Sequence, residues 1–453
     1  MFLVFSALNR MIFSKSFFRF FLFSFLVVSL INSVSELCAQ DSLTVDQVLL
    51  QALKINPAIE QVTANTAAAE ERVRTVESQL YPDVSLQASY ANIGPLVELT
   101  IPDMGSFHFY PQDNYDVHLS ARYLVMDFGR RSAMLAMNRS RAQTFHDAVE
   151  QTRMGVAMAA VQTFHAILFL QKSIQVQDEQ IAALKGNLEM IQKRVQAGTA
   201  THFDVLTTQV RVATAQNQKA EIENVLQKQE AVLRQLLNLS PNTPVPIRGT
   251  WQLVPTDLNE DSLFQTASHQ RIELITAHDA EESARQQVRW SALGRMPALR
   301  LNLQYGTKNG YIPNLNEMKN NWVASIGAEM PIFSGGRIAH QEEEAKALLL
   351  AEQAHTRDVE RQIRVDVEQA ASDVRTAREK IDISQVRLDQ AHEAVAMARS
   401  RYETGSATNL DLLDAQSAES MAKLARLQAL YQYTISRYEL ERAVGSRFWE
   451  QTP

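Results

Sequence analysis

Two carboxylates, Asp411 and Asp414, are the residues whose types and spacing come closest to doing chemistry. They lie in the segment RYETGSATNLDLLDAQ, and a relaxed copy of it, RVQAGTATHFDVLTTQ, places Asp204 at the position of Asp411. Paired acids serve as general acid and base when an apolar pocket shifts their pKa values. Acids in the first turn of a helix instead stabilise the helix dipole. No apolar pocket is evident around these polar segments, so we favour the second interpretation over catalysis.

The rest of the sequence argues against an enzyme, a metal site or a nucleic-acid partner. The ten histidines are scattered, with no HExxH motif, no paired metal-ligand spacing and no phosphate-binding glycine loop. Gly335 and Gly336 lack the rest of any nucleotide-binding motif. A net charge of −7 gives no basic surface for nucleic acid, and the single cysteine, Cys38, allows no disulfide framework. We therefore expect no cofactor and no metal.

The two copies of the acidic segment belong to a large internal repeat. They are related by a shift of 207 positions, which also superposes Gly129 on Gly336. Earlier in each half the shift is 215, from Pro82 to Pro297, so the difference must fall between Pro82 and Gly129. Such a duplication predicts one fold built from two similar halves. We expect a first repeat at residues 40–240, a proline-rich connector at 241–262 and a second repeat at 263–453.

Residues 1–39 predict a secretory signal peptide. A basic flank precedes an apolar core at 20–30, and Leu37-Cys38-Ala39 offers a processing site. The apolar part is shorter than the roughly 20 residues of a spanning helix, which disfavours a permanent membrane anchor. Lipidation of Cys38 and a start at Met11 stay open as alternatives.

The first half predicts a helix, two strands and a long helical hairpin. The apolar periodicity gives a helix at 43–79 interrupted at Asn56-Pro57, then strands around 84–90 and 117–125. The glycine- and proline-rich segment 91–114 is expected to be a loop. One very long helix, or two nearly continuous ones, of about 100 Å in all follows at 131–197, and a returning helix at 203–237.

The second half repeats this order. We expect a continuous helix at 263–293, strands at 299–305 and 322–332 around a loop at 306–321, a helix of about 67 residues ending at 404, and a last helix from 409 to about 444. Each hairpin reverses at a glycine, Gly198 or Gly405, where helices commonly end in the left-handed conformation. Thr201 in the first copy, and Thr408 with Asn409 in the second, offer N-cap oxygens to the returning helix.

The four strands have the length and alternation of membrane-spanning barrel strands. Four strands cannot close a barrel, and an open sheet edge in lipid leaves backbone groups unsatisfied at several kcal/mol each. Closure must therefore come from other copies of the chain. A soluble sheet covered by the helices is the ordinary alternative, but helices of about 100 Å cannot all lie on a sheet of about 30 Å.

Three segments of the sequence resemble those of a known protein family. The pattern RYxxGxxxxLDxLDAQ at 401–416 is close to the signature of TolC-type outer membrane efflux proteins, and the strand-turn-helix elements at 127–129 and 333–336 add support. The resemblance covers 43–448. It implies an α+β membrane protein in which long coiled-coil hairpins and four transmembrane strands per chain contribute to a trimeric, twelve-stranded outer membrane barrel and a periplasmic tunnel.

The resemblance also implies a function and partners. The chain would be a passive exit duct of a tripartite efflux or type I secretion system, working as a homotrimer in outer membrane lipid. It would dock onto a periplasmic adaptor driven by an inner-membrane transporter. Small-molecule efflux is the expected cargo class, ahead of protein or metal export. The alternative, from another class of protein, is a periplasmic coiled-coil scaffold or adaptor without a barrel, which the four alternating strands disfavour.

Carried over by motif, Asp411 and Asp414 would ring the periplasmic mouth, attract cations and raise one another's pKa values. Asp204 has the same two interpretations, gate residue or first-turn acid, and Tyr402 matches a position that holds the closed mouth. Ala407 departs from the family pattern, which has an arginine there, so part of the closing network is in doubt.

The hairpin tips are the second implied site. An adaptor would dock onto the two exposed turns, whose glycines also have the plain explanation of helix C-caps. The candidate docking residues are Gly198, Thr199, Gly405 and Ser406.

Overall fold

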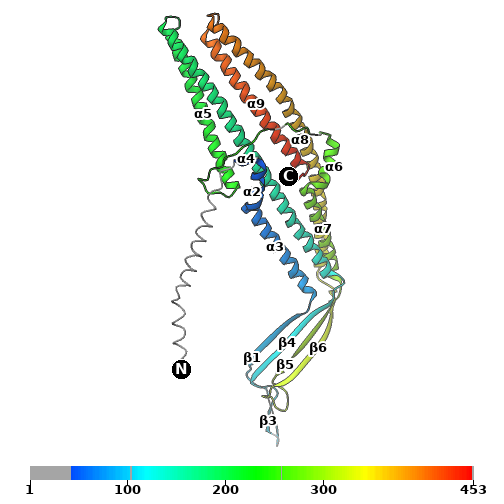
Figure 1. Ribbon diagram of the computed structural model, residues 1–453. Helices are drawn as coiled ribbons and strands as arrows, with labels where there is room; N and C mark the ends of the chain where they lie inside the picture. The colour runs from blue at the N-terminus through cyan, green and yellow to red at the C-terminus, as the bar shows by residue number, and fades with distance from the viewer. Residues whose placement is uncertain (1–41, 103–104, 252, 257, 451–453) are drawn as a thin grey trace, which may run out of the picture.

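A computed structural model describes residues 42–102, 105–251, 253–256 and 258–450. The expected signal peptide, with Cys38 and Met11, lies outside these residues. The chain is elongated, with two long helical hairpins at one end and a β-sheet at the other (Figure 1).

The sheet contains four antiparallel strands in the order β1-β4-β5-β6. Their bounds are Asp83–Asn92, Asp113–Met126, Ala298–Lys308 and Lys319–Glu329. The register places apolar side chains opposite one another on one face, with Leu119 paired to Tyr305 and Tyr305 to Trp322. This face is not covered by the helices, since Tyr305 is 64% exposed and Trp322 74% exposed. The predicted amphipathic strands are therefore confirmed, and their apolar face is free.

Two details of the strand prediction are wrong. β6 begins at Lys319 and ends at Glu329, so Met330 and Ile332 lie beyond it. The segment expected to be a loop between the first two strands contains a small hairpin, β2 (Glu98–Ile101) paired with β3 (Gly105–His108). Its alternation is too short to stand out from the surrounding glycines and prolines.

The helices pair off between the two halves with equal lengths of 11, 21, 67 and 35 residues. This equality confirms the internal repeat, whereas the boundaries that we gave its units stay a prediction. The first-half helices are α2 (Val45–Ile55), α3 (Pro57–Glu77), α4 (Arg130–Gln196) and α5 (His202–Leu236). The second-half helices are α6 (Glu260–Gln270), α7 (Ile272–Ala292), α8 (Arg337–Glu403) and α9 (Asn409–Ala443). Short 3-10 turns at Ser78–Leu80 and Leu293–Arg295 lead into β1 and β5.

The continuous helix expected at 263–293 is instead broken at Arg271, between α6 and α7. Its counterpart in the first half is Asn56, whose side chain accepts a hydrogen bond from the Ala58 N–H and so caps α3 ahead of Pro57. The second half has Arg271-Ile272 where the first has Asn56-Pro57, so no local residue signals a helix break there. The repeat register alone could have located it.

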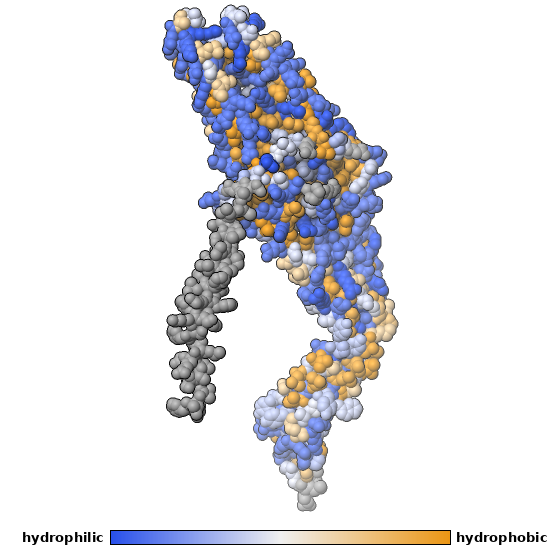
Figure 2. Space-filling model, viewed as in Figure 1, coloured by the Kyte–Doolittle hydropathy of each residue, from blue (hydrophilic) through white to orange (hydrophobic). Residues whose placement is uncertain are grey.

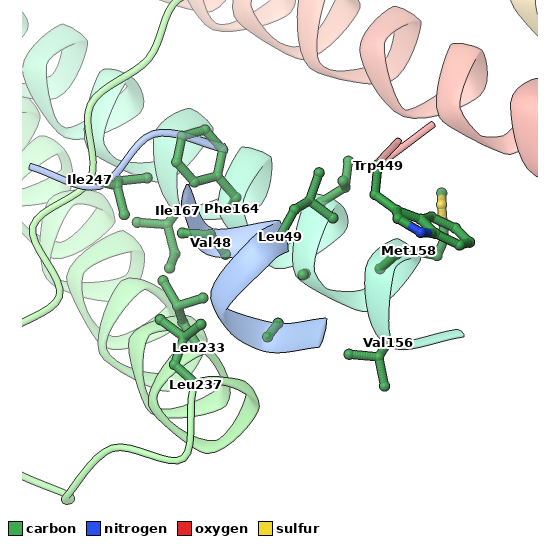
Figure 3. Close-up of a cluster of buried hydrophobic side chains, with 14 of the residues drawn as sticks. Val48, Leu49, Val156, Met158, Phe164, Ile167, Leu233, Leu237, Ile247 and Trp449 are labelled. Atoms are coloured by element: carbon green, nitrogen blue, oxygen red, sulfur yellow. The ribbon is translucent and has the colours of Figure 1, made fainter. Parts of the chain in front are cut away.

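A hydrophobic core lies where α2 and the end of α5 pack against the middle of α4 (Figure 3). Val48, Phe164, Ile167, Leu233 and Leu237 are all at most 1% exposed. α4 is the one described helix that is long and apolar enough to cross a membrane by composition, yet 61% of its apolar window is buried. Its apolar character is therefore explained by this core.

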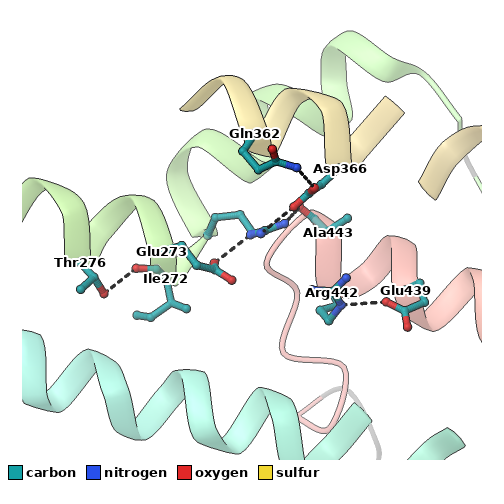
Figure 4. Close-up of polar contacts among 9 residues, drawn as sticks. Ile272, Glu273, Thr276, Gln362, Asp366, Glu439, Arg442 and Ala443 are labelled. Atoms are coloured by element: carbon teal, nitrogen blue, oxygen red, sulfur yellow. Dashed lines mark hydrogen bonds and ion pairs between the residues drawn. The ribbon is translucent and has the colours of Figure 1, made fainter. Parts of the chain in front are cut away.

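Arg271 is buried at the break between α6 and α7 and connects three segments. Its Nε donates to Glu273 at 2.9 Å, its Nη2 to Asp366 of α8 at 3.1 Å, and its Nη1 to the Ala443 carbonyl oxygen at the end of α9 at 3.1 Å. Figure 4 shows these partners around the helix break, with Gln362 also donating to Asp366. The guanidinium thus holds the last helix against the middle of α8.

We predict that Arg271→Ala lowers the free energy of unfolding by about 1–3 kcal/mol, because it removes the buried donor to the Ala443 carbonyl oxygen and the charged partner of the partly exposed Asp366 and Glu273 carboxylates. Arg361→Ala is the matched control, since the Arg361–Asp358 pair on α8 is exposed and such pairs contribute about 0–1 kcal/mol. Urea unfolding of the detergent-solubilised protein, followed by circular dichroism, measures both. Equal effects of the two substitutions would contradict the prediction.

His165 of α4 lies beside the hydrophobic core that contains Phe164, and it is 5% exposed. Neither of its ring nitrogens has a hydrogen-bond partner among the described residues. Phe164 packs edge-on against it at 5.2 Å, and Tyr438 of α9 is at 6.0 Å. Burial, with Arg437 nearby, lowers the pKa of His165 to about 4. The imidazole is therefore neutral in the folded protein at neutral pH.

This burial predicts an acid-sensitive fold. The unfolded chain binds the proton near pH 6.5 and the folded chain only near pH 4, so stability is lost as the pH falls between these values, by about 3 kcal/mol in all. We expect His165→Phe to remove most of this loss, and His355→Gln, at an exposed position on α8, to retain it. Unfolding curves at pH 7, 5.5 and 4.5 test this; an unchanged pH slope in His165→Phe would refute it.

Candidate functional site: the two hairpin tips

The two hairpin tips lie at the end of the molecule farthest from the sheet (Figure 1). Each ends its first helix in the same way. Gly198 and Gly405 have φ of 74° and 76°, as expected for a left-handed cap. The Thr199 N–H donates to the Arg194 carbonyl and the Ser406 N–H to the Arg401 carbonyl, both at 2.8 Å. These are Schellman caps, which leave the turns themselves exposed.

The returning helices begin with reciprocal capping boxes. The Asp204 N–H donates to Thr201 Oγ1 at 3.2 Å, and the Thr201 N–H donates back to the Asp204 carboxylate at 3.0 Å. Thr408 and Asp411 make the same two bonds at 3.2 and 2.8 Å, and in both turns the threonine hydroxyl also donates to the carboxylate. The contacts of both acids therefore support the interpretation that each stabilises the first turn of its helix.

These bonds favour the ionised form of Asp411 within one chain. The backbone N–H and then the hydroxyl of Thr408 hold the pKa of Asp411 below its usual range, with Arg401 adding a favourable charge. This direction is opposite to the one expected from acids repelling one another in a ring. The ring concerns several copies of the chain and stays a prediction.

Asp414 and Tyr402 each contact the first hairpin. Asp414 accepts a hydrogen bond from Arg211 of α5 at 3.1 Å, an exposed ion pair. Tyr402 is 6% exposed, and the Arg194 guanidinium lies 4.5 Å from its ring centroid and donates to its carbonyl oxygen at 3.4 Å. Tyr402 is thus held by an arginine of the neighbouring hairpin.

No metal or cofactor chemistry is supported at this end of the chain. Within the residues that the structure describes, no group of three or more His, Cys, Asp and Glu side chains could hold a metal ion. The three acids and the one tyrosine of the candidate gate take part in capping boxes, an ion pair and a cation–π contact. The site is therefore built for holding helices and presenting two turns.

Comparison with known proteins matches the chain to the outer membrane efflux protein family over residues 48–239 and 263–446, most of each half. The chain belongs to this family. It is 22% identical to the outer membrane protein TolC of Vibrio cholerae, over 87% of this chain and 89% of TolC. It is also 22% identical to the proteases secretion protein PrtF of Dickeya chrysanthemi, over 74% and 73% of the two chains. The crystal structure of VceC from Vibrio cholerae has the same fold, with a TM-score of 0.78 and 18% identity over 89% of this chain and 96% of that one.

As an outer membrane efflux protein, the chain is a channel and not an enzyme, of the class that serves tripartite efflux and type I secretion systems. The sheet is the outer membrane end and the hairpins extend into the periplasm. This confirms the expected fold class and location. It also rules out the scaffold or adaptor without a barrel.

Sequence reasoning missed one part of the efflux protein's tip. Asn409 was expected to help cap α9, but its side chain turns inward, 4% exposed, and bonds Asn187 and Thr208 of the first hairpin. Thr408 alone provides the cap. The signal was weak, because an asparagine beside a helix start is usually a cap.

We predict that Gly405→Ala destabilises the channel by about 1–2 kcal/mol, because a Cβ strains a residue at positive φ. Gly186→Ala in α4 is the matched control: it is exposed, its added Cβ meets nothing within 4 Å, and its φ is not positive. We expect that control to be neutral or up to about 1 kcal/mol stabilising. Thermal unfolding of both variants measures the difference, and a loss of stability in both alike would count against it.

Proposed function

We propose that three copies of the chain close one twelve-stranded barrel that passively conducts substrates out of the periplasm. Among the described residues, β1 pairs only with β4 and β6 only with β5, so both edges of the sheet need partners. The exposed apolar face of the sheet would otherwise meet water. Three equal sheets joined edge to edge satisfy both requirements, with lipid on the apolar side and a polar lumen lined by residues such as His118, Ser120 and Arg122.

The ends of the apolar face fit outer membrane lipid. Figure 2 shows hydrophobic residues gathered where the sheet meets the helices. Ile332 and Phe333 there are 87% and 90% exposed, and Tyr90 and Trp322 lie toward the other end of the strands, 60% and 74% exposed. Aromatic residues are typical of both membrane boundaries. The position of Met330 and Ile332 beyond β6 thus agrees with a hydrophobic collar at the periplasmic boundary.

We further propose that the tips dock onto a periplasmic adaptor, which links the channel to an inner-membrane transporter. Both turns present exposed residues at Gly198, Thr199, Gly405 and Ser406, while their backbone groups are already satisfied by the caps. An adaptor can therefore bind them without unfolding a helix. Asp204, Tyr402, Asp411 and Asp414 are the proposed gate residues, because they join the turns to the helices that must move for the mouth to widen.

We propose that the chain is first exported from the cytoplasm. Residues 1–39 direct it across the inner membrane as a signal peptide, and the two repeats at 40–240 and 263–453, with their connector at 241–262, form the mature protomer. Small-molecule efflux is the cargo class that we propose, with protein secretion as the alternative suggested by the similarity to PrtF.

Photo-crosslinking in cells tests the docking proposal. A photoreactive amino acid at Thr199 or Ser406 should capture one periplasmic adaptor at both tips, and its associated pump then identifies the cargo class. The same amino acid at Asp358, exposed on α8 and away from the tips, is the control and should not capture the adaptor. Capture of neighbouring copies alone from both tips would overturn docking, and a chain that washes off membranes without detergent would overturn the barrel.

A further inference from the structure

Two carboxyl groups meet in the helical wall of the channel, on the side of the core that faces the sheet. They belong to Asp147 of α4 and Asp279 of α7, so their contact joins the first half of the chain to the second. The two side chains are within hydrogen-bond reach of each other; Asp147 is 4% exposed and Asp279 is half-buried. Beside them, Ser140 Oγ donates to the Asp279 carbonyl oxygen at 2.6 Å. We call Asp147 and Asp279 the acid pair.

The acid pair has no direct cationic partner. Among the described residues, neither carboxylate forms an ion pair, and Asp147 accepts only from uncharged groups, Gln143 Nε2 at 3.4 Å and Thr276 Oγ1 at 3.2 Å. The threonine hydroxyl also donates to the Ile272 carbonyl oxygen at 2.9 Å, so its one proton is shared. A buried carboxylate held by such long, neutral bonds is unfavourable, and a second negative charge beside it is more so. This arrangement favours one bound proton.

The pKa directions agree with this geometry. Burial raises the pKa of Asp147, and burial together with the charge of Asp147 raises the pKa of Asp279. Charged neighbours on the same two helices act in both directions. His146 of α4 and His278 of α7 favour the ionised form when they are protonated, whereas Glu282 of α7 opposes it. The acids therefore hold their proton mainly because they are buried together.

The helices on either side face the pair with charges that are paired with one another. α3 contributes Glu70, which lies 3.1 Å from His146. α8 contributes Gln353, which is uncharged and donates to Glu281 of α7 at 3.4 Å. Glu281 also forms an ion pair with Arg285 one turn along α7. These charges surround the acid pair without neutralising it.

The internal repeat indicates that acids are not needed to pack these helices. The shift of 207 positions carries Asp147 to Ala354 of α8, and the shift of 215 carries Asp279 to Ala64 of α3. Both equivalents are exposed small residues on helices of the same lengths as α4 and α7. A helix of either kind therefore forms with alanine at this position. The acids of the α4–α7 contact must serve another purpose.

We propose that the acid pair is a proton-dependent joint, in which one proton shared by the two carboxyl groups holds α7 to α4. The two halves of the chain are then fastened more firmly in acidic surroundings than in alkaline ones. The joint lies in the periplasmic wall of the channel, far from the hairpin tips (Figure 1). It makes Asp147 and Asp279 positioning residues whose effect depends on the pH around the channel.

The pH dependence of unfolding tests the sign. A folded chain that keeps this proton to a higher pH than the unfolded chain does loses stability as the pH rises. We therefore expect the urea midpoint of the parent to fall between pH 5 and pH 8 relative to that of Asp279→Asn, whose amide donates to the Asp147 carboxylate at every pH. Comparison with a variant also cancels the contribution of His165, which has the opposite sign. Asp358→Asn, at an exposed position on α8, is the control and should follow the parent. Equal pH slopes in the parent and Asp279→Asn would overturn the proposal.

Infrared spectroscopy detects the proton itself, because a protonated carboxyl has a carbonyl band that a carboxylate lacks. Labelling the aspartate carboxyls with carbon-13 separates them from the glutamates. As the pH is lowered, we expect the parent to gain one protonated aspartate per chain before the exposed aspartates titrate. This early band should be absent from both Asp147→Asn and Asp279→Asn, since removing either charge lowers the pKa of the other acid. An early band that survives in one variant would show a single buried acid and overturn the sharing.

Hydrogen exchange locates the effect. After correction for the intrinsic rate, we expect the backbone amides of 143–149 and 276–282 to exchange at least about threefold faster at pH 8 than at pH 5 in the parent, and equally in Asp279→Asn. The double variant His146→Gln, His278→Gln should keep the change seen in the parent. A change that disappears with the histidines would assign the pH dependence to them instead and refute the joint. Because the acid pair lies within one chain, these results do not depend on the number of copies in the barrel.

Discussion

A sheet that faces lipid must satisfy every backbone hydrogen bond within protein, and the rest of this chain depends on that constraint. Four strands with two unpaired edges and one exposed apolar face cannot meet it alone. The constraint therefore acts on assembly as well as on folding. It also explains why the chain devotes so few residues to the sheet and so many to helices, since the sheet needs only enough residues to cross a bilayer once per strand.

The helices meet a different requirement, which is to extend far from the sheet into the periplasm. Two helices of 67 residues extend about 100 Å, and neither could be stable alone in water without a partner to cover its apolar stripe. The hairpins provide that partner beyond the middle of each long helix, α3 and α7 cover the part nearest the sheet, and α2 and α6 pack near the middle (Figure 1). Because both halves have helices of equal length, the two tips end at the same level and can act on one partner.

Polar contacts decide how these long elements are joined. Arg271 fastens the end of α9 to α8, where the α6–α7 break would otherwise leave a gap. Arg194 covers Tyr402, and hydrogen bonds with Asn187 and Thr208 hold Asn409 between α4 and α5. Such contacts are directional, so they fix alignment in a structure whose apolar seams alone would tolerate sliding. The apolar cores supply stability, and the polar contacts select one arrangement.

Local patterns in the sequence determined a large part of this structure: the repeat, the helix lengths, the four amphipathic strands, and the caps at Gly198, Gly405, Thr201 and Thr408. These follow from periodicity and from backbone preferences that act within a few residues. Only the tertiary structure decided the buried contacts of Arg271 with α8 and α9, the inward turn of Asn409 and the pairing of Asp414 with Arg211. Each of these depends on a partner from about 100 to more than 200 positions away, and a side chain buried by a distant helix leaves no periodic signal of its own.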